Sequence, residues 1–456
     1  MRLTIFEADE GNQKDTNHQP FLAVNIEQSH RKVSPFAGFY FIVDALTRLG
    51  INSFISDHLP KRSANATYSY ADIALSLFAN CMLEGERLSD LVLIKEKFFA
   101  GQGFLIPSPD TVEYACQQLK PAVCVEQLMN QKGNIIEHQH CYSPLMNALL
   151  LSLAIKTGQL KTGSQGYTID YDHMVLATDK QDARLSYKQV RGYHPGMAAI
   201  GRIPVFIQNH NGNTPARHQQ KDSLALYFNQ LAAQGIEIEN FRADSASYQA
   251  DVIALVDSSC KQFYIRMLDF KALRSTYGQM EETTWKTVQI GHEKVEVASL
   301  PYQPAKSEKT YRLVVTRRLK EDRQLDLETG TAYRYGAIIT NDEVQSEQEV
   351  IQFYNLRGDA EDTNRYMPND FNLSHLPFMD MNTNTVYMYL MGYAAILFEW
   401  AKTVLVQNKV ATITTTMRVK AVCFHYLSVA GEWVVKKGKQ ILKIYTSNTS
   451  YKPLQI

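Results

Sequence analysis

The feature that most constrains the fold is the stretch from Tyr167 to Leu176, with the sequence Tyr-Thr-Ile-Asp-Tyr-Asp-His-Met-Val-Leu. Its β-branched and aromatic composition predicts a β-strand. Because side chains alternate between the faces of a strand, Asp170 and Asp172 share one face. Two carboxylates on an otherwise apolar strand are unfavourable unless a cation offsets them. The strand therefore either has a solvated face at a sheet edge or binds a hard metal ion, Mg²⁺ or Mn²⁺, through oxygen ligands.

The segments that follow predict an open α/β sheet. After the aspartate strand, the pattern predicts further strands and helices in the order β, β, α, β, α, β, at residues 198–200, 204–209, 216–234, 236–241, 247–257 and 262–267. In such sheets, functional sites gather at strand ends and crossover points. Asp244 lies just beyond the strand at 236–241 and before a helix start, which makes it a second candidate ligand. An ordinary acidic helix N-cap gives the same pattern.

Regions of different character flank this sheet. Residues 1–160 carry apolar residues at helical spacing and are predicted to be all-helical, including a helix at 123–129. Val, Tyr and Thr predominate from about residue 270 to 336, which predicts an inserted β-rich block with strands at 284–300, 310–317 and 331–340. The longest uncharged apolar run, residues 386–398, is shorter than the roughly 17–25 residues that span a bilayer. We interpret it as a buried helix of a soluble protein.

A helix is predicted from Ser346 onward, beyond the β-rich block. If it continues past Gly358, Tyr354, Arg357 and Glu361 lie on one face, and Arg365 follows one turn later. The pattern predicts that Pro368 ends this helix. A solvated surface glutamate is the alternative interpretation of Glu361.

The net charge of the chain is zero, so no global basic field indicates a nucleic-acid partner. The charge is uneven, because residues 402–456 contain nine Lys and Arg but one acid, Glu432. This segment is either a solvated basic tail or a phosphate-contacting surface. The six cysteines have no paired short spacing, which favours a reducing compartment over a disulfide scaffold. The first residues lack the apolar segment of a signal peptide.

The run Glu137-His138-Gln139-His140-Cys141 resembles a group of metal ligands. A structural zinc site needs four ligands, usually in two spaced pairs, and the sequence offers no second pair. We interpret the run as a polar loop.

These features together resemble the DDE transposases of bacterial insertion sequences, and most of all the insertion sequence 1380 family. The resemblance covers most of residues 65–446, and it depends on the order and spacing of short segments. The matching segments are Ile169–Asp172, Tyr187-Lys188, Gly192–Pro195, Asn211–Asn213, Phe241–Asp244, Tyr354-x₂-Arg357-Gly358-x₂-Glu361, Asp370-Phe371, Leu376-Pro377 and Glu432–Val434.

The resemblance implies an α/β fold with an RNase H-like core, a mixed sheet flanked by helices, and a β-rich insertion between Asp244 and Glu361. The interval between these residues is long enough to hold the β-rich block. The implied regions are a helical, DNA-binding N-terminal region (1–160), the first part of the catalytic core (161–268), the insertion (269–340), the second part of the core with the Glu361 helix (341–380) and a helical, basic C-terminal region (381–456).

The resemblance also implies a mechanism. Asp172, Asp244 and Glu361 would bind two Mg²⁺ or Mn²⁺ ions about 3.5–4 Å apart. Water would hydrolyse the phosphodiester at a transposon end, and the freed 3′-hydroxyl would then attack a DNA strand in line. The implied partners are double-stranded DNA with terminal inverted repeats and a second copy of the chain, in the bacterial cytoplasm and without a membrane. The expected DNA-contacting residues are Tyr354, Arg357, Arg365 and Lys188.

Two positions depart from the family's pattern. The family usually has Thr two residues after its first aspartate, and Met174 holds that place after Asp172. On this alignment Asp172 is the first carboxylate, and Asp170 is a supporting or alternative ligand. In related groups a Lys follows the Glu by seven residues; Pro368 stands there, with Arg365 as a substitute. The open alternatives are an RNase H-like nuclease without strand transfer, a catalytically inactive DNA-binding derivative and a structural protein that binds no nucleic acid.

Overall fold

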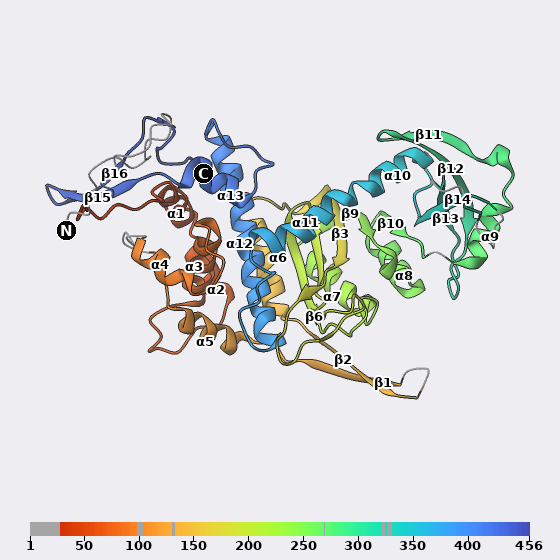
Figure 1. The fold of residues 1–456 in the computed structure, drawn as a ribbon, viewed down its shortest axis with the longest axis horizontal. Coiled ribbons are helices and arrows are strands. Elements are labelled where there is room, and N and C mark those ends of the chain that lie inside the picture. The colour runs from red at the N-terminus through yellow and green to blue at the C-terminus, as the bar shows by residue number, and fades with distance from the viewer. Residues whose placement is uncertain (1–27, 98–103, 130–132, 269, 321–323, 326–330) are drawn as a thin grey trace, which may run out of the picture.

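The computed structural model describes residues 28–97, 104–129, 133–268, 270–320, 324–325 and 331–456, with only the backbone described at 271–272 and 359–365. An 11-stranded sheet runs through the middle of the molecule, in the order β1-β2-β8-β7-β3-β9-β10-β14-β13-β12-β11 (Figure 1). Its five central strands are β8 (Ile203–His210), β7 (Gly196–Ile200), β3 (Gly163–His173), β9 (Ile236–Ala243) and β10 (Gln262–Arg266).

The directions of these five strands define the core. β7 runs antiparallel to both of its neighbours, β8 and β3. On the other side, β3, β9 and β10 run parallel to one another. Three antiparallel strands followed by two parallel strands, in this order, form the mixed sheet of an RNase H-like fold. The predicted fold class and the predicted strand at Tyr167–Leu176 are therefore confirmed, the strand ending at His173.

Helices cover both faces of the core sheet. Helices α6 (Pro144–Lys156) and α12 (Met381–Gln407) pack on β8, and α7 (Gln220–Ala233) packs on β9 beside α8 (Ala250–Ser259) (Figure 1). The buried Asn147 of α6 exchanges two hydrogen bonds with the backbone of Ile207, at 3.0 and 2.8 Å. An amide pair of this kind satisfies the backbone of β8 and fixes the helix against the strand.

Helix α12 is the central helix of the core. Among the described residues it is the single helix long and apolar enough to cross a membrane, but 83% of its 18-residue apolar window is buried inside the protein. The predicted buried helix at 386–398 is thus confirmed and extended. Gly392 lets α12 approach α6, because a Cβ at this position would lie 2.8 Å from Leu150 Cδ2.

The N-terminal region is largely helical, and its helix α3 packs against α12. Ser69 and Asp72 form a capping box at the start of α3, and the Ser108 side chain caps α5. The helices of this region are α1 (Phe39–Arg48), α2 (Ile51–His58), α3 (Tyr70–Met82), α4 (Asp90–Lys97) and α5 (Pro109–Leu119).

The prediction that residues 1–160 are all-helical is wrong at one place. Residues 123–129, predicted as a helix, and the Glu137–Cys141 run, predicted as a loop, form the antiparallel hairpin β1 (Cys124–Met129) and β2 (Ile135–Cys141). A segment this short does not distinguish strand from helix by periodicity, and here the pairing of β1 with β2, which itself pairs with β8, decides. The hairpin projects from the edge of the sheet in Figure 1.

The β-rich insertion continues the core sheet, because β14 pairs antiparallel with β10. The predicted strands at 310–317 and 331–340 are present, whereas the predicted strand at 284–300 is a hairpin of two strands that turns at residues 291–292. The short helix α9 (Lys271–Gly278) and a 3₁₀ turn (Glu282–Thr284) were not predicted. The insertion strands are β11 (Lys286–Ile290), β12 (Glu293–Tyr302), β13 (Tyr311–Leu319) and β14 (Tyr333–Thr340).

The predicted helix after Ser346 is divided at Leu356 into α10 (Glu347–Asn355) and α11 (Arg357–Asp370). Ser346 and Glu349 form the capping box of α10. The prediction that Pro368 ends the helix is wrong, since α11 runs to Asp370. Pro368 lies inside the last turn of α11, where its missing N–H removes one hydrogen bond of the helix.

The C-terminal region is only partly helical, contrary to prediction. After α13 (Val419–Val422) and a π-helical turn (Cys423–Leu427), the chain forms a hairpin of β15 (Gly431–Lys436) and β16 (Lys439–Ile444). The Trp433 ring packs edge-on against Tyr40 of α1, at 5.2 Å between centroids, and holds the hairpin to the N-terminal helices. A small separate sheet consists of β4 (Leu176–Ala177), β5 (Arg184–Leu185) and β6 (Arg191–Tyr193).

Candidate active site

The register of the two parallel strands β3 and β9 places Asp172 beside Asp244. Tyr171 of β3 pairs with Ala243, the last residue of β9. Asp172 follows Tyr171 within β3, and Asp244 follows Ala243 just beyond the end of β9. The sequence Asp170-x-Asp172 therefore faces Arg242-x-Asp244. Since side chains two residues apart share a face, one aspartate of β3 meets an arginine and the other meets a second aspartate.

Asp170 is neutralised by this arrangement. Its two carboxylate oxygens accept hydrogen bonds of 2.7 and 2.8 Å from Arg242 Nε and Nη2, and both side chains are buried. Arg242 also donates to the Phe353 oxygen of α10 at 2.7 Å. Both oxygens of Asp170 are engaged in a bidentate pair, which favours the supporting role over that of a metal ligand.

Asp172 and Asp244 form a carboxylate pair at the ends of neighbouring strands. Burial and then the charge of Asp172 raise the pKa of Asp244, although its Oδ1 accepts a hydrogen bond of 3.0 Å from Ala246 N–H. The hydrogen bond is the helix-cap interaction anticipated from the sequence. A raised pKa shows that this environment disfavours a second negative charge.

Arg357 is the cation nearest to the pair. Its Nη1 donates to Asp172 Oδ2 at 3.1 Å, and the two side chains are 10% and 22% exposed. Tyr354 is buried and donates its hydroxyl to the Ala243 oxygen at 3.3 Å, which fixes α10 at the end of β9. This burial favours a positioning role for Tyr354 over the predicted contact with DNA.

Glu361 and Arg365 lie on α11, which contacts β3. Glu361 is four residues after Arg357, so the two Cβ atoms share one face of the helix. The side chains of residues 359–365, which include Glu361 and Arg365, are not described in the structure. The convergence of Glu361 on the two aspartates therefore stays a prediction. Lys188 is exposed on the loop between β5 and β6, with its Nζ 5.7 Å from the ring centre of Tyr187.

Arg266 is a further residue of the site that was not predicted from the sequence. Ile265 of β10 pairs with Ala243 of β9, so Arg266 and Asp244 lie next to each other at the same end of the sheet. The charge of Arg266 lowers the pKa of Asp244, against the larger effect of burial. The order Asp172, Asp244, Arg266 across β3, β9 and β10 could have been found from the strand ends alone.

A group of largely buried histidines was missed as well. The rings of neighbouring members lie 4.9–6.1 Å apart between centroids, and burial lowers the pKa of every one. Within the described part of the chain, no three or more His, Cys, Asp or Glu side chains form a group that could hold a metal ion. The members of this histidine group are His138, His140, His173, His194, His210 and His218.

The strand order and the paired carboxylates at the ends of β3 and β9 define an enzyme class with an RNase H-like core that transfers phosphoryl groups. The chain belongs to the family described as Transposase DDE domain group 1, whose model matches residues 22–454. It is therefore a DDE-type transposase and acts in DNA transposition. Members of this family generally use divalent metal ions.

Two further comparisons bear on the chain. Among solved structures, it is similar to the piggyBac transposase in a synaptic complex with hairpin DNA, at 12% identity and a TM-score of 0.40. That similarity covers 87% of this chain and 80% of the other. No curated protein matches the chain.

Proposed function

We propose that Asp172, Asp244 and Glu361 form the catalytic triad, which cleaves the DNA at transposon ends and then joins it to a target. The observation that supports this most is the pairing of Asp172 with Asp244 by the register of β3 and β9. Neighbouring carboxylates at strand ends are unfavourable in isolation and are suited to a divalent cation.

The described residues fit Mg²⁺ or Mn²⁺. Asp172 and Asp244 supply oxygen donors, and burial together with the neighbouring Asp172 raises the pKa of Asp244. Glu361 would add a third carboxylate from α11. Two bound ions would supply an activated water and stabilise the charge on the reacting phosphate.

The remaining residues of the site hold this constellation together. The Asp170–Arg242 ion pair joins β3 to β9 and, through the Phe353 oxygen, to α10. Arg357 keeps Asp172 oriented in the DNA-free protein. A guanidinium also suits bidentate contact with a phosphate, so Arg357 is placed to bind the strand that approaches the carboxylates.

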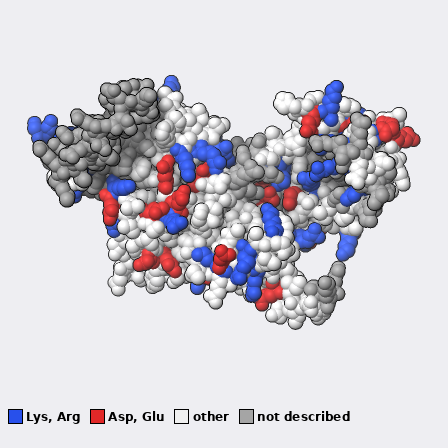
Figure 2. Space-filling view, in the orientation of Figure 1, with Lys and Arg blue, Asp and Glu red and all other residues white. Residues whose placement is uncertain are grey.

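Several basic segments are suited to the rest of the DNA. Lysines 436, 437, 439 and 443 lie on the β15–β16 hairpin, and Figure 2 shows Lys and Arg side chains at the end of the molecule where Figure 1 places it. Contacts of this kind give affinity that falls with salt. We propose that this hairpin, Lys188 and Arg365 contact the duplex, and that residues 1–160 contribute a DNA-binding region.

The finer biological assignment follows from the sequence resemblance. We propose a bacterial insertion-sequence transposase of the 1380 family, which acts in the cytoplasm as a homodimer on terminal inverted repeats. Inverted repeats that flank the gene would support this assignment directly.

The experiment is a cleavage assay with purified protein and DNA that carries the ends flanking the gene. We expect nicking with Mg²⁺ or Mn²⁺ but not in EDTA, and products in which an end is joined to target DNA. Asp172→Asn, Asp244→Asn and Glu361→Gln should each abolish both activities, whereas Glu237→Gln, an exposed carboxylate on the same strand β9, should retain them.

The outcomes separate the alternatives. Nicking that survives Asp244→Asn or Glu361→Gln would refute the proposed triad. Nicking without any joined product would indicate a hydrolytic nuclease, and binding without nicking would indicate an inactive derivative.

A further inference from the structure

Helix α11 is fixed to the core near both of its ends, and Glu361 lies between the two contacts in the sequence. At the beginning of the helix, Arg357 donates to Asp172 of β3 at 3.1 Å. Near its end, Tyr366 donates its hydroxyl to Glu399 Oε1 of α12 at 2.7 Å. In Figure 1, α11 extends from α10 towards α12. The placement of Glu361 therefore depends on contacts with two different parts of the core.

The two contacts lie on opposite sides of α11. Tyr366 is nine residues after Arg357, which corresponds to about two and a half turns of an α-helix. Asp370 follows Tyr366 by one turn on the same side, and its Oδ2 accepts a hydrogen bond of 2.7 Å from Arg418 Nε. Contacts on opposite sides fix the rotation of a helix about its own axis as well as its position.

Glu399 is the buried acceptor of this network. Its Oε1 also accepts a hydrogen bond of 2.8 Å from Lys402 Nζ, and the side chains of Lys402 and Glu399 are 2% and 13% exposed. Burial lowers the pKa of Lys402, although the charge of Glu399 raises it. A buried ion pair contributes little net stability, because the cost of desolvation offsets the attraction. Orientation of Tyr366 is a task that such a pair can perform.

Further contacts hold the Tyr366 ring in place. The ring packs edge-on against Phe371, at 5.0 Å between centroids, and lies 6.4 Å from the Phe398 ring of α12. The Arg202 guanidinium, in the turn between β7 and β8, lies 5.6 Å from the ring centre. Tyr366 is only 3% exposed, so the ring and its hydroxyl have little freedom to move. The position of α12 is thus transmitted to α11.

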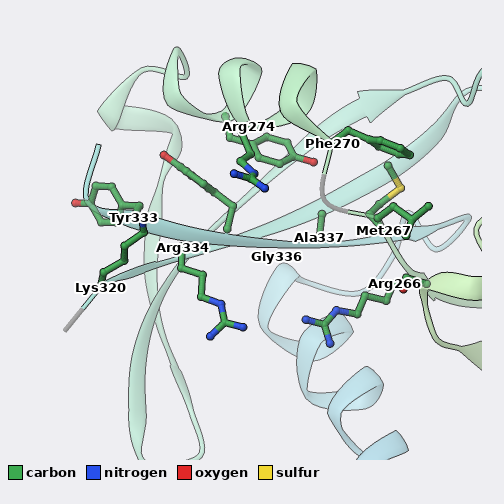
Figure 3. Close-up of a pocket in the computed structure, with 13 residues that line it drawn as sticks. Arg266, Met267, Phe270, Arg274, Lys320, Tyr333, Arg334, Gly336 and Ala337 are labelled. Atoms are coloured by element: carbon green, nitrogen blue, oxygen red, sulfur yellow. The ribbon is translucent and has the colours of Figure 1, made fainter. Parts of the chain in front are cut away.

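We propose that Tyr366 is a positioning residue: through Glu399 it fixes the rotation of α11 that turns Glu361 towards the paired aspartates. The inference rests on the proposed function, because it takes Glu361 as the third carboxylate. It gives α12, the central helix of the core, a task in the placement of a metal ligand. Tyr366, Glu399 and Lys402 are not among the described residues that line the cavity of about 500 Å³ between β10, α9 and β14 (Figure 3). Their substitution should therefore leave the insertion unchanged.

Binding of Mn²⁺ to the DNA-free protein tests the proposal without any cleavage, with the EPR signal of free Mn²⁺ as the measurement. Tyr366→Phe removes one hydroxyl and should weaken Mn²⁺ binding about 10- to 100-fold, the range for residues that orient metal ligands. In a protein that already carries Glu361→Gln, the same substitution should change the affinity by less than about two-fold, because the ligand that Tyr366 positions is gone.

A second variant separates orientation from stability. The triple variant Tyr366→Phe, Glu399→Leu and Lys402→Met removes the hydroxyl together with the ion pair, so neither charge stays buried without its partner. Exchange of a buried ion pair for apolar side chains of similar volume is often neutral or stabilising. This variant should therefore fold and melt at or above the temperature of the unaltered protein, and it should still bind Mn²⁺ as weakly as Tyr366→Phe.

Two controls match these substitutions. Tyr311→Phe removes a hydroxyl that donates to Asp257 Oδ2 at 3.3 Å, in a contact between β13 and α8. Gly392→Ala perturbs α12 at its contact with Leu150 of α6 instead of its contact with α11. Both should bind Mn²⁺ within about two-fold of the unaltered protein, because sites without shared partners act independently. Circular dichroism should show that all variants are folded.

Two results would overturn the proposal. Unchanged Mn²⁺ affinity in Tyr366→Phe or in the triple variant would show that the network only packs α11 against α12. An equal loss of affinity with and without Glu361→Gln would show that Tyr366 acts through another group. The proposed triad fails by a different result, namely nicking that survives Glu361→Gln, so the two failures are distinguishable.

Discussion

Arg357 Nη1 donates a hydrogen bond of 3.1 Å to Asp172 Oδ2, and this contact joins α11 to the end of β3 across 185 residues of sequence. Arg357 also offsets the charge of Asp244, whose pKa it lowers. Arg357 thus supplies positive charge to both carboxylates. The stability of the metal-free protein should depend on it.

Replacing Arg357 with Ala should destabilise the metal-free protein by about 1–3 kcal/mol, because it leaves partly buried carboxylates without their charged donor. Mg²⁺ should recover more stability in this variant than in the unaltered protein, since ligand binding to the folded state stabilises it. Thermal unfolding with EDTA or Mg²⁺ measures both effects. Lys420→Ala, which removes an exposed ion pair with Glu86, should cost at most about 0.5 kcal/mol. An equal response to Mg²⁺ in all proteins would contradict the role of Arg357.

Asp244 should make the metal-free protein less stable as pH rises. Its pKa is raised in the folded state, so the folded protein binds the proton more tightly than the unfolded chain, whose value is 3.8. Stability therefore falls as pH rises from about 3.8 through the raised folded value. In EDTA at neutral pH, Asp244→Asn should be more stable than the unaltered protein and should keep the cap to Ala246. Mg²⁺ should then stabilise the unaltered protein and not the variant; the reverse ranking in EDTA would refute this account.

Much of this site could be predicted from local patterns. The alternation in Tyr167–His173 gave the shared face of Asp170 and Asp172, and the strand-end rule gave Asp244. What local patterns could not give is the partner across the sheet, because Arg242 is 72 residues from Asp170. The register of two parallel strands decides which aspartate is neutralised and which stays available.

The features that were predicted wrongly or not at all also depend on contacts between distant segments. Residues 124–129 form a strand because β2 pairs with them and, in turn, with β8, which no periodicity within six residues records. The histidine group could not be predicted either, since its members come from separate segments between residues 138 and 218. Tertiary pairing overrides local preference most readily in short segments.

The Asp170–Arg242 pair should be structural. Asp170→Asn leaves a buried arginine without its charged partner, which should destabilise the protein by about 3–5 kcal/mol. The increase in melting temperature caused by Mg²⁺ should remain as in the unaltered protein, because Asp170 is not expected to bind the ion. For comparison, Arg318→Ala breaks an exposed pair with Glu293 and should cost less than about 1 kcal/mol. If Mg²⁺ did not raise the melting temperature of Asp170→Asn, Asp170 would instead be a ligand of the ion.

Two glycines on neighbouring helices should respond oppositely to alanine. In α12, Gly392→Ala places a methyl group 2.8 Å from Leu150 Cδ2 and should cost about 1–3 kcal/mol through overpacking. In α11, a Cβ on Gly358 would meet nothing within 4 Å, so Gly358→Ala should stabilise the helix by about 0.5–1 kcal/mol. Chemical denaturation of the two variants measures both changes. Similar changes in the free energy of unfolding for the two variants would show that the helices do not pack as described.

The histidine group should make the fold sensitive to acid. Burial lowers the pKa of His173 to about 3 and that of His210 well below its usual 6.5, so the folded state keeps both rings neutral. The unfolded chain takes up these protons as pH falls below about 6.5, and stability is lost by up to roughly 1.4 kcal/mol per pH unit for each such ring. Denaturation at pH 7, 6 and 5 should show this decline, and His210→Gln should make it shallower by about one proton. His292→Gln, at an exposed turn between β11 and β12, should leave the slope unchanged. A decline that is the same in His210→Gln as in the unaltered protein would place its origin outside the histidine group.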